Sequence, residues 1–222
     1  KQLPVSLPGR QVELRCLEPH RSDPLYPCAE LIRGLAGFKP DTTPAQRYQR
    51  LDEMLRIFTL DAEGRDLVAD LLGLPLPEAS PVREMPGDQW RERMLDALLT
   101  ILRANRQQPL LVVLEDAHWA DSSTLLLFER LLREPEQRPL MLLITARPEF
   151  AAQPWLDAGA LHLELPHLSA ELARGMVAGL TDGLDRGELQ RVLAMADGVP
   201  LFIEELAQWA ASDGARQGLP LT

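Results

Sequence analysis

The chain alternates between short apolar runs and longer segments with apolar residues at helical spacing. Two runs, 110–114 and 140–144, are continuous, which is typical of parallel strands buried on both faces. Two others, 11–17 and 161–165, alternate apolar with polar residues and predict strands with one covered face. The pattern predicts a parallel α/β sheet whose last strand is 161–165.

Apolar residues three or four positions apart predict helices between and after these strands. The predicted helices start at Tyr26 and Ser169 or span about 44–58, 67–72, 88–106, 122–133, 188–196 and the closing segment from Pro200. Asp88 and Ser169 are predicted to be N-caps, and the proline-rich segment 73–87 is predicted to be a loop. In the closing helix, Phe202, Leu206 and Trp209 share one face, which we expect to be its core stripe.

Two adjacent carboxylates, Glu115 and Asp116, follow the run 110–114 directly. At the carboxyl end of a parallel strand they would face the crevice where open α/β sheets bind ligands. One acid can hold Mg²⁺ while the other orients or deprotonates an attacking water, which is the division of labour that nucleotide hydrolysis requires. The alternative is that 116–121 is a solvated loop in which Asp121 caps the next helix.

The stretch PLLVVLEDAHWAD, residues 109–121, resembles the Walker B strand of P-loop ATPases of the AAA+/STAND type. Its last four residues resemble the "DxHWAD" form of regulatory ATPase modules, which are fused to nucleotide cyclase, protein kinase or LuxR-type transcription-factor domains in large bacterial signalling proteins. The resemblance extends from about Val12 to about Trp209. It implies that Glu115 and Asp116 bind Mg²⁺ and that Asp116 is the catalytic acid/base.

Two further stretches carry the same resemblance. Thr145 and Arg147, after the run 140–144, resemble the sensor 1 position, which implies that Arg147 binds the γ-phosphate; the alternative is an ion pair with Glu149 or another surface acid. The turn 197–201 resembles the Gly-x-Pro motif of STAND proteins, whose proline, here Pro200, packs near the adenine and links nucleotide state to the lid. A glycine C-cap followed by proline is also how ordinary helices end and restart.

The phosphate-binding motif of such ATPases, GxxxxGK[ST], is absent from the sequence. Lysine occurs only at Lys1 and Lys39, and neither follows a glycine. We therefore expect a fragment that lacks the Walker A segment and is inactive alone: an incomplete P-loop NTPase core, 1–168, with a small helical lid, 169–222. In the implied sheet order the missing strand lies between 140–144 and 161–165. The gap would be closed by a shift of the last strand or filled by another segment. Otherwise its backbone groups would stay unpaired and the chain would be marginally stable.

Composition and net charge argue against several classes of function. A net charge of −10 argues against direct binding of nucleic acid or an anionic membrane, because either needs a basic surface. No apolar run approaches the roughly 18 residues of a membrane span, and the first residues lack a signal peptide's apolar core. We expect a cytoplasmic protein. Cys16 and Cys28 are expected to be free buried thiols; a zinc site that adds His20 fits no common spacing.

The leading hypothesis is an ATP-binding and hydrolysing regulatory switch within a larger bacterial signalling protein. It would use ATP and Mg²⁺, with fused effector and sensor domains as partners and nucleotide-dependent homo-oligomerisation as an option. The alternative is a degenerate ATPase fold that serves as a non-enzymatic scaffold between those domains. A third hypothesis is an unrelated metal-dependent hydrolase that uses Glu115, Asp116 and His118.

Overall fold

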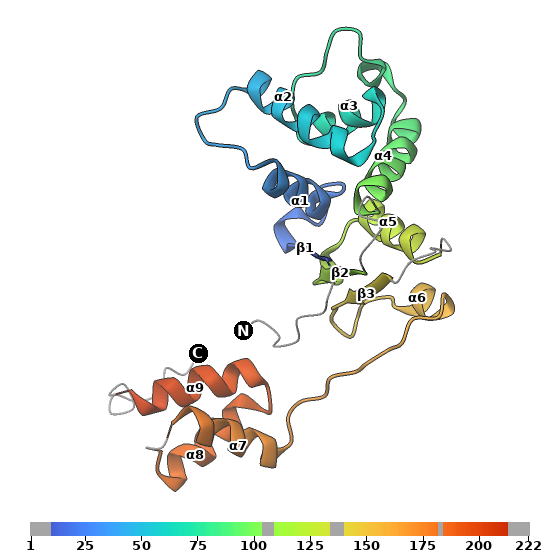
Figure 1. Cartoon of the computed structure of the whole chain (residues 1–222). Coiled ribbons are helices and arrows are strands. Elements are labelled where there is room, and N and C mark those ends of the chain that lie inside the picture. The colour runs from blue at the N-terminus through green and yellow to red at the C-terminus, as the bar shows by residue number, and fades with distance from the viewer. Residues whose placement is uncertain (1–9, 104–108, 134–139, 182–183, 213–222) are drawn as a thin grey trace. The chain divides into compact units, whose positions relative to one another are not determined.

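The computed structural model describes residues 10–103, 109–133, 140–181 and 184–212 (Figure 1). The chain divides into two compact units, Lys1–Ala160 and Leu161–Thr222. The first unit contains β1 (Arg10–Arg15), η1 (Glu18–His20), α1 (Tyr26–Ala36), α2 (Pro44–Leu55), η2 (Arg56–Phe58), α3 (Ala62–Leu71), η3 (Pro81–Glu84), α4 (Gly87–Leu102), β2 (Leu110–Glu115), η4 (Ala117–Trp119), α5 (Ser122–Arg133), β3 (Leu140–Ile144) and α6 (Gln153–Asp157). The second contains α7 (Ala170–Leu180), α8 (Arg186–Ala196) and α9 (Pro200–Ala211).

The described strands form one parallel sheet in the order β1-β2-β3. The register sets Arg15 beside Glu115 and Leu114 beside Ile144, so the three carboxyl ends lie at one edge. Because parallel neighbours need a crossover, α4 precedes β2 and α5 precedes β3. The predicted α/β class and both strands are confirmed, but β3 is not buried on both faces as expected, because Met141 and Leu143 are exposed.

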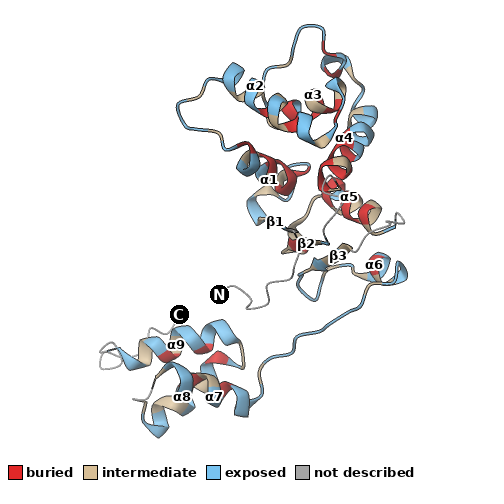
Figure 2. Cartoon of the chain, in the orientation of Figure 1, coloured by how far each residue is buried: buried red, intermediate tan, exposed pale blue. Residues whose placement is uncertain are grey.

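One face of the sheet is covered by helices, and on the other face the residues of β3 are exposed. Val12, Leu14 and Leu114 are at most 5% exposed on the covered face, where α1, α4 and α5 pack (Figures 1 and 2). On the opposite face Met141 is 57% and Leu143 is 39% exposed. Helices cover only one face of β1, which explains why its apolar and polar residues alternate. Within the described sheet, β3 is an edge strand.

The predicted last strand is wrong. Residues 161–165 form no strand, and Leu161, Leu163 and Leu165 are 94%, 83% and 91% exposed. Alternation of apolar and polar residues gives a segment one apolar and one polar face. The segment becomes a β-strand only where its backbone forms hydrogen bonds with a neighbouring strand. No described strand pairs with this segment.

Most predicted helices of the first unit are confirmed, with two corrections at their starts. Asp88 is not an N-cap: α4 begins at Gly87 after Pro86, and no side chain caps it. The helix expected from residue 67 begins at Ala62, because the Asp61 side chain accepts a hydrogen bond of 2.7 Å from the Gly64 N–H. The loop predicted over 73–87 also holds the short turn η3.

The described part of the second unit consists of α7, α8 and α9 around a small core. Its buried residues are Ala173, Val177, Val192, Ala196, Ile203 and Ala207. Ser169 caps α7 as predicted. The stripe predicted for α9 is correct only in part: Leu206 packs against this core, but Phe202 is 52% exposed, and the fully buried residues of the helix are Ile203 and Ala207. The small Ala207 and branched Ile203 face α7 and α8, so the neighbouring helices rather than side-chain size select the buried face.

Within the described residues, no helix combines the length and apolar character that crossing a membrane requires.

Candidate nucleotide site at the carboxyl end of the sheet

Backbone hydrogen bonds bring the ends of the three strands together. The Cys16 N–H donates to the Glu115 carbonyl at 2.9 Å, and the Thr145 N–H donates to the Leu114 carbonyl at 3.0 Å. The Ala117 N–H then donates to the Thr145 carbonyl at 2.9 Å. These bonds extend the ladder past each strand, so the residues that follow β2 and β3 lie side by side.

The turn at Asp116 is held by the neighbouring strand. Asp116 has φ +55°, a left-handed conformation that aspartate tolerates better than most residues. Its N–H donates to the Thr145 Oγ1 at 3.0 Å. Thr145 therefore fixes the backbone from which the Asp116 carboxylate projects, and the structure brings three predicted residues, Glu115, Asp116 and Thr145, into one cluster.

Arg15, which the sequence analysis did not single out, completes this cluster. Its Nε lies 3.6 Å from the Glu115 Oε2 and 3.7 Å from the Asp116 Oδ2. Arg15 is the last residue of β1 and is in register with Glu115, so its position at a strand end was the available signal. The arginine side chain is 65% exposed and each carboxylate about one third exposed, so these ion pairs are weak and leave the carboxylates free to exchange partners.

The carboxylate pair fits Mg²⁺ but not a fully protein-ligated metal. Among the described residues no three His, Cys, Asp or Glu side chains gather as metal ligands, so the hydrolase that needs His118 and the zinc site with His20 are not supported. Mg²⁺ instead takes one or two carboxylates and completes its shell with water and phosphate oxygens. Glu115 and Asp116 can supply that protein share, and the printed sequence contains no GxxxxGK[ST] motif.

The predicted free thiols are confirmed, and their chemistry is inert. Cys16 and Cys28 are both buried and unpaired. Burial raises the pKa of the Cys16 thiol to about 12, with further contributions from the charges of Asp121 and Asp116. Burial also raises the pKa of Cys28. Both thiols therefore keep their protons at neutral pH and are poor nucleophiles and poor ligands.

Arg147 extends from the segment after β3 over an aromatic ring. Its Cζ lies 5.1 Å from the Trp119 ring centroid, a cation–π contact, and in the described part of the chain it makes no ion pair with Glu149. The His118 and Trp119 rings lie 4.4 Å apart, and both His118 ring nitrogens are buried without a hydrogen-bond partner among the described residues. The contact with the Trp119 ring orients Arg147, and the exposed Arg147 guanidinium can still bind an anion.

Asp121 has a structural role instead. Its carboxylate accepts hydrogen bonds from the Ser123 and Thr124 N–H groups at 2.8 and 3.1 Å, and from the Thr124 hydroxyl. It also accepts one at 3.0 Å from the N–H of Leu25, a fully buried residue with φ +57°. Asp121 thus caps α5, as the alternative interpretation of this loop expected, and the same side chain joins the start of α5 to the start of α1.

Pro200 lies in the second unit and starts α9. Two residues before it, Gly198 has φ +71°, and its carbonyl accepts a hydrogen bond of 2.8 Å from the Leu168 N–H. A Cβ on Gly198 would lie 2.5 Å from the Leu168 carbonyl oxygen, so only glycine fits. The local geometry is that of a tight helix junction, and a role for Pro200 toward a nucleotide stays a prediction.

Comparison with known proteins adds the family. The chain is 34% identical over 134 residues to the uncharacterized protein R02095 of Rhizobium meliloti (strain 1021), an overlap that covers 55% of this chain and 12% of that protein's length. No solved structure matches the chain. A family model described as "AAA ATPase domain" matches residues 4–144, which span the sheet from β1 to β3 with Glu115 and Asp116. The chain therefore belongs to the AAA ATPase domain family.

Proposed function

We propose that this chain forms the Walker B and sensor part of a nucleotide-dependent regulatory switch in a larger signalling protein. The observation that carries the proposal is the carboxylate pair at the end of β2, with Asp116 fixed by a hydrogen bond from its N–H to the Oγ1 of Thr145, the residue that follows β3. A reactive pair must be held before the substrate arrives, because catalysis of phosphoryl transfer is mostly positioning and electrostatics.

Each residue has a separate task in this proposal. Glu115 and Asp116 bind Mg²⁺, which neutralises charge on the phosphates, and Asp116 orients the attacking water and accepts its proton. Arg147 binds the terminal phosphate through charge-assisted hydrogen bonds. Arg15 turns away when the metal binds, since its two ion pairs are solvent-exposed and weak. Pro200 and the second unit act as the lid that responds to the nucleotide.

The phosphate cradle comes from another segment of the longer protein. Two features of the sheet support this: β3 is an edge strand, and Met141 and Leu143 are exposed on the open face. An additional parallel strand would pair with the free backbone groups of β3, and the helix after it would cover that apolar face. Such a strand, loop and helix is the unit that carries GxxxxGK[ST].

Arg15 also favours a second candidate function, a scaffold that has lost nucleotide chemistry. A guanidinium within 4 Å of both carboxylates already supplies the positive charge that Mg²⁺ would bring. In a scaffold that arrangement would be permanent, and the fused domains would use the fold only as a rigid spacer.

The test compares binding of Mg·ATP by calorimetry to this chain and to a longer form that carries GxxxxGK[ST]. Asp116→Asn is the matched variant, because asparagine keeps the side-chain shape and tolerates φ +55°. The switch predicts binding and hydrolysis by the longer form only. It also predicts that Asp116→Asn lowers kcat by about a hundredfold or more while ATP binding persists.

The scaffold predicts a different pattern. Neither form would bind Mg·ATP, and Arg15→Gln would leave Mg²⁺ binding absent. Hydrolysis by the longer form that survives Asp116→Asn unchanged would remove Asp116 from the mechanism.

A further inference from the structure

Asp121 joins two parts of the first unit that lie 96 residues apart in the chain. Its Oδ1 accepts hydrogen bonds from the N–H groups of Ser123 and Thr124 at the start of α5. Its Oδ2 accepts from the Thr124 hydroxyl and, at 3.0 Å, from the Leu25 N–H. One carboxylate oxygen therefore caps the backbone of α5, while the other holds the turn from which α1 begins.

The turn at Leu25 depends on this support. Leu25 is the N-cap residue of α1, has φ +57° and makes no side-chain cap of its own. Its carbonyl accepts from the Cys28 and Ala29 N–H groups at 3.0 Å, which closes the first turn of the helix. The left-handed conformation is unfavourable for a residue with a Cβ. Loss of the bond to Asp121 would leave a buried donor unpaired beside this strained backbone.

A short turn with internal hydrogen bonds separates Asp121 from the carboxylate pair. The Trp119 N–H donates to the Asp116 carbonyl at 2.9 Å, and the Ala120 N–H donates to the Ala117 carbonyl at 3.0 Å. Ala117 is 1% exposed and anchors the turn in the core. Because its backbone is bonded internally, the turn transmits a displacement of Asp116 to Asp121.

Asp116 and Leu25 are held in the same way. Both are left-handed residues with a side chain, at φ +55° and +57°. Each donates its N–H to a side-chain oxygen from a distant part of the chain, Asp116 to Thr145 and Leu25 to Asp121. Strained backbone conformations persist only where the surroundings hold them, and they are common in switch regions. The turn 116–121 connects these two points.

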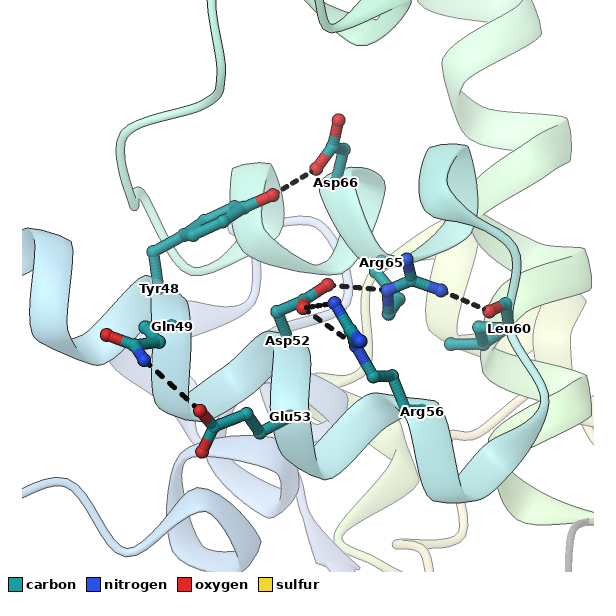
Figure 3. Close-up of polar contacts among 8 residues, drawn as sticks. All are labelled: Tyr48, Gln49, Asp52, Glu53, Arg56, Leu60, Arg65 and Asp66. Carbon is teal, nitrogen blue, oxygen red and sulfur yellow. Dashed lines mark hydrogen bonds and ion pairs between the residues drawn. The ribbon is translucent and has the colours of Figure 1, made fainter.

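Side-chain hydrogen bonds continue from α1 to the next two helices. The Arg50 Nε of α2 donates to the Ala36 carbonyl at the end of α1 at 2.7 Å. Figure 3 shows the bonds between α2 and α3, among them the one from the Arg65 Nε to the Asp52 carboxylate at 2.5 Å. The side chains of Asp52 and Arg65 are both less than one fifth exposed, so this pair is shielded from water.

A second hydrogen bond between α2 and α3 is also shielded. The Tyr48 hydroxyl donates to the Asp66 Oδ1 at 2.6 Å (Figure 3), and Asp66 is 7% exposed. Burial raises the pKa of the Tyr48 hydroxyl, and the hydrogen bond to Asp66 raises it further, so Tyr48 keeps its proton and remains a donor. These bonds join α1, α2 and α3, so a displacement at the start of α1 is passed to the other two helices.

We propose that the turn 116–121 couples the carboxylate pair to helices α1–α3, with the hydrogen bond between Asp121 and Leu25 as the link. The signal rests on the proposed nucleotide switch: when Asp116 binds Mg²⁺ the turn is displaced, Asp121 shifts relative to Leu25, and the start of α1 responds. The link itself is a property of the fold and operates without nucleotide. Since coupling between two sites is reciprocal, a change at Leu25 also changes the backbone at Asp116.

The experiment measures amide hydrogen exchange by NMR in the 222-residue chain without nucleotide. Thr145→Val keeps the shape of the side chain but removes the acceptor of the Asp116 N–H, and it should speed exchange at the distant Leu25 amide about fivefold or more. Thr145→Ser keeps the hydroxyl and should exchange as the wild type does. The Gly64 amide is the matched control, because it also donates to a carboxylate, Asp61 at 2.7 Å, but lies outside this route.

Asp121→Asn tests the reciprocal direction. Asparagine keeps the oxygen that caps α5 but turns an amide nitrogen, which cannot accept a hydrogen bond, toward the Leu25 N–H. The Asp116 amide should then exchange about fivefold faster or more, although its own bond to Thr145 is untouched. Exchange at Gly64 should stay unchanged.

Unchanged exchange at Leu25 in Thr145→Val, or at Asp116 in Asp121→Asn, would overturn the coupling. An equal rise at Gly64 would also overturn it, because the effect would then be a general loss of stability. In the longer form that carries GxxxxGK[ST], Mg·ATP should change exchange at Leu25 in the wild type but not in Asp121→Asn. Absence of Mg·ATP binding would count against the nucleotide switch, whereas bound nucleotide with unchanged exchange at Leu25 would overturn this regulation.

Discussion

The carboxylates at the strand ends and the carboxylate of Asp66 in α3 differ in their exposure to water. Glu115 and Asp116 are about one third exposed and share Arg15, so solvent and a nearby cation stabilise their charges in the unliganded protein. Asp66 is 7% exposed and has a neutral tyrosine as its partner. Water and Arg15 therefore stabilise the charges at the strand ends, whereas Asp66 depends on the hydrogen bond from Tyr48.

The same contrast occurs within a single loop. Asp116 and Asp121 are five residues apart, yet Asp116 receives no hydrogen bond to its side chain among the described residues, while Asp121 accepts from the start of α5 and from Leu25. A carboxylate with many backbone partners supports the fold, and one with few is available for chemistry. Burial and hydrogen-bond partners together thus separate structural from functional acids.

The largest expected effect comes from removing the structural acid of that loop. Asp121→Ala should lower the free energy of unfolding by about 3 kcal/mol, because it removes a helix cap and leaves the buried Leu25 N–H without an acceptor. Asp116→Gly, which suits the left-handed backbone, should change it by less than about 0.5 kcal/mol. Urea unfolding of both variants is the measurement, and equal losses would contradict the contrast within the loop.

The next largest effect is expected at Asp66 and its partner Tyr48. Tyr48→Phe should destabilise the fold by about 1.5 kcal/mol, because Asp66 then loses its one hydrogen bond in a buried place. Adding Asp66→Asn to this variant should recover part of the loss, since the unpaired charge is gone. Thermal unfolding of the single and double variants gives the coupling. A double variant less stable than Tyr48→Phe alone would show that Asp66 is not destabilising when unpaired.

A smaller effect concerns pH. Since the pKa of Tyr48 is raised in the fold, the folded state holds this proton above about pH 10, where tyrosine in an unfolded chain releases it. The contribution of Tyr48 to stability is therefore complete below that pH and is lost as pH rises toward the folded pKa. Urea unfolding in alkaline buffers should show a steeper loss for the wild type than for Tyr48→Phe, and parallel curves would contradict it.

The smallest effect on stability is expected at the strand ends. Arg15→Gln removes two exposed ion pairs and should change the free energy of unfolding by less than about 0.5 kcal/mol. In the longer form that carries the phosphate-binding motif, the same change should tighten Mg²⁺ binding, because a competing cation is gone. Calorimetry on this variant and on Arg33→Gln, an exposed arginine paired with Glu30, separates local competition from net charge.

The sequence alone determined much of the sheet and its candidate site. The runs that became β2 and β3 were apolar throughout, and the polar residues after each run marked the strand ends, because such residues do not belong in the middle of a buried strand. The chain order then placed Glu115, Asp116 and Thr145 at one edge. The cap at Ser169 was likewise predicted correctly from neighbouring residues, whereas the same local criterion failed at Asp88.

The tertiary structure decided what depends on distant partners. Residues 161–165 alternate as a strand does, yet without a pairing neighbour they stay exposed and irregular. The buried face of α9, the position of Arg15 beside two carboxylates, and the isolation of Asp66 all result from packing between segments far apart in the chain. Local patterns specify hydrogen bonds made within a few residues, whereas burial and charge pairing depend on which surfaces meet.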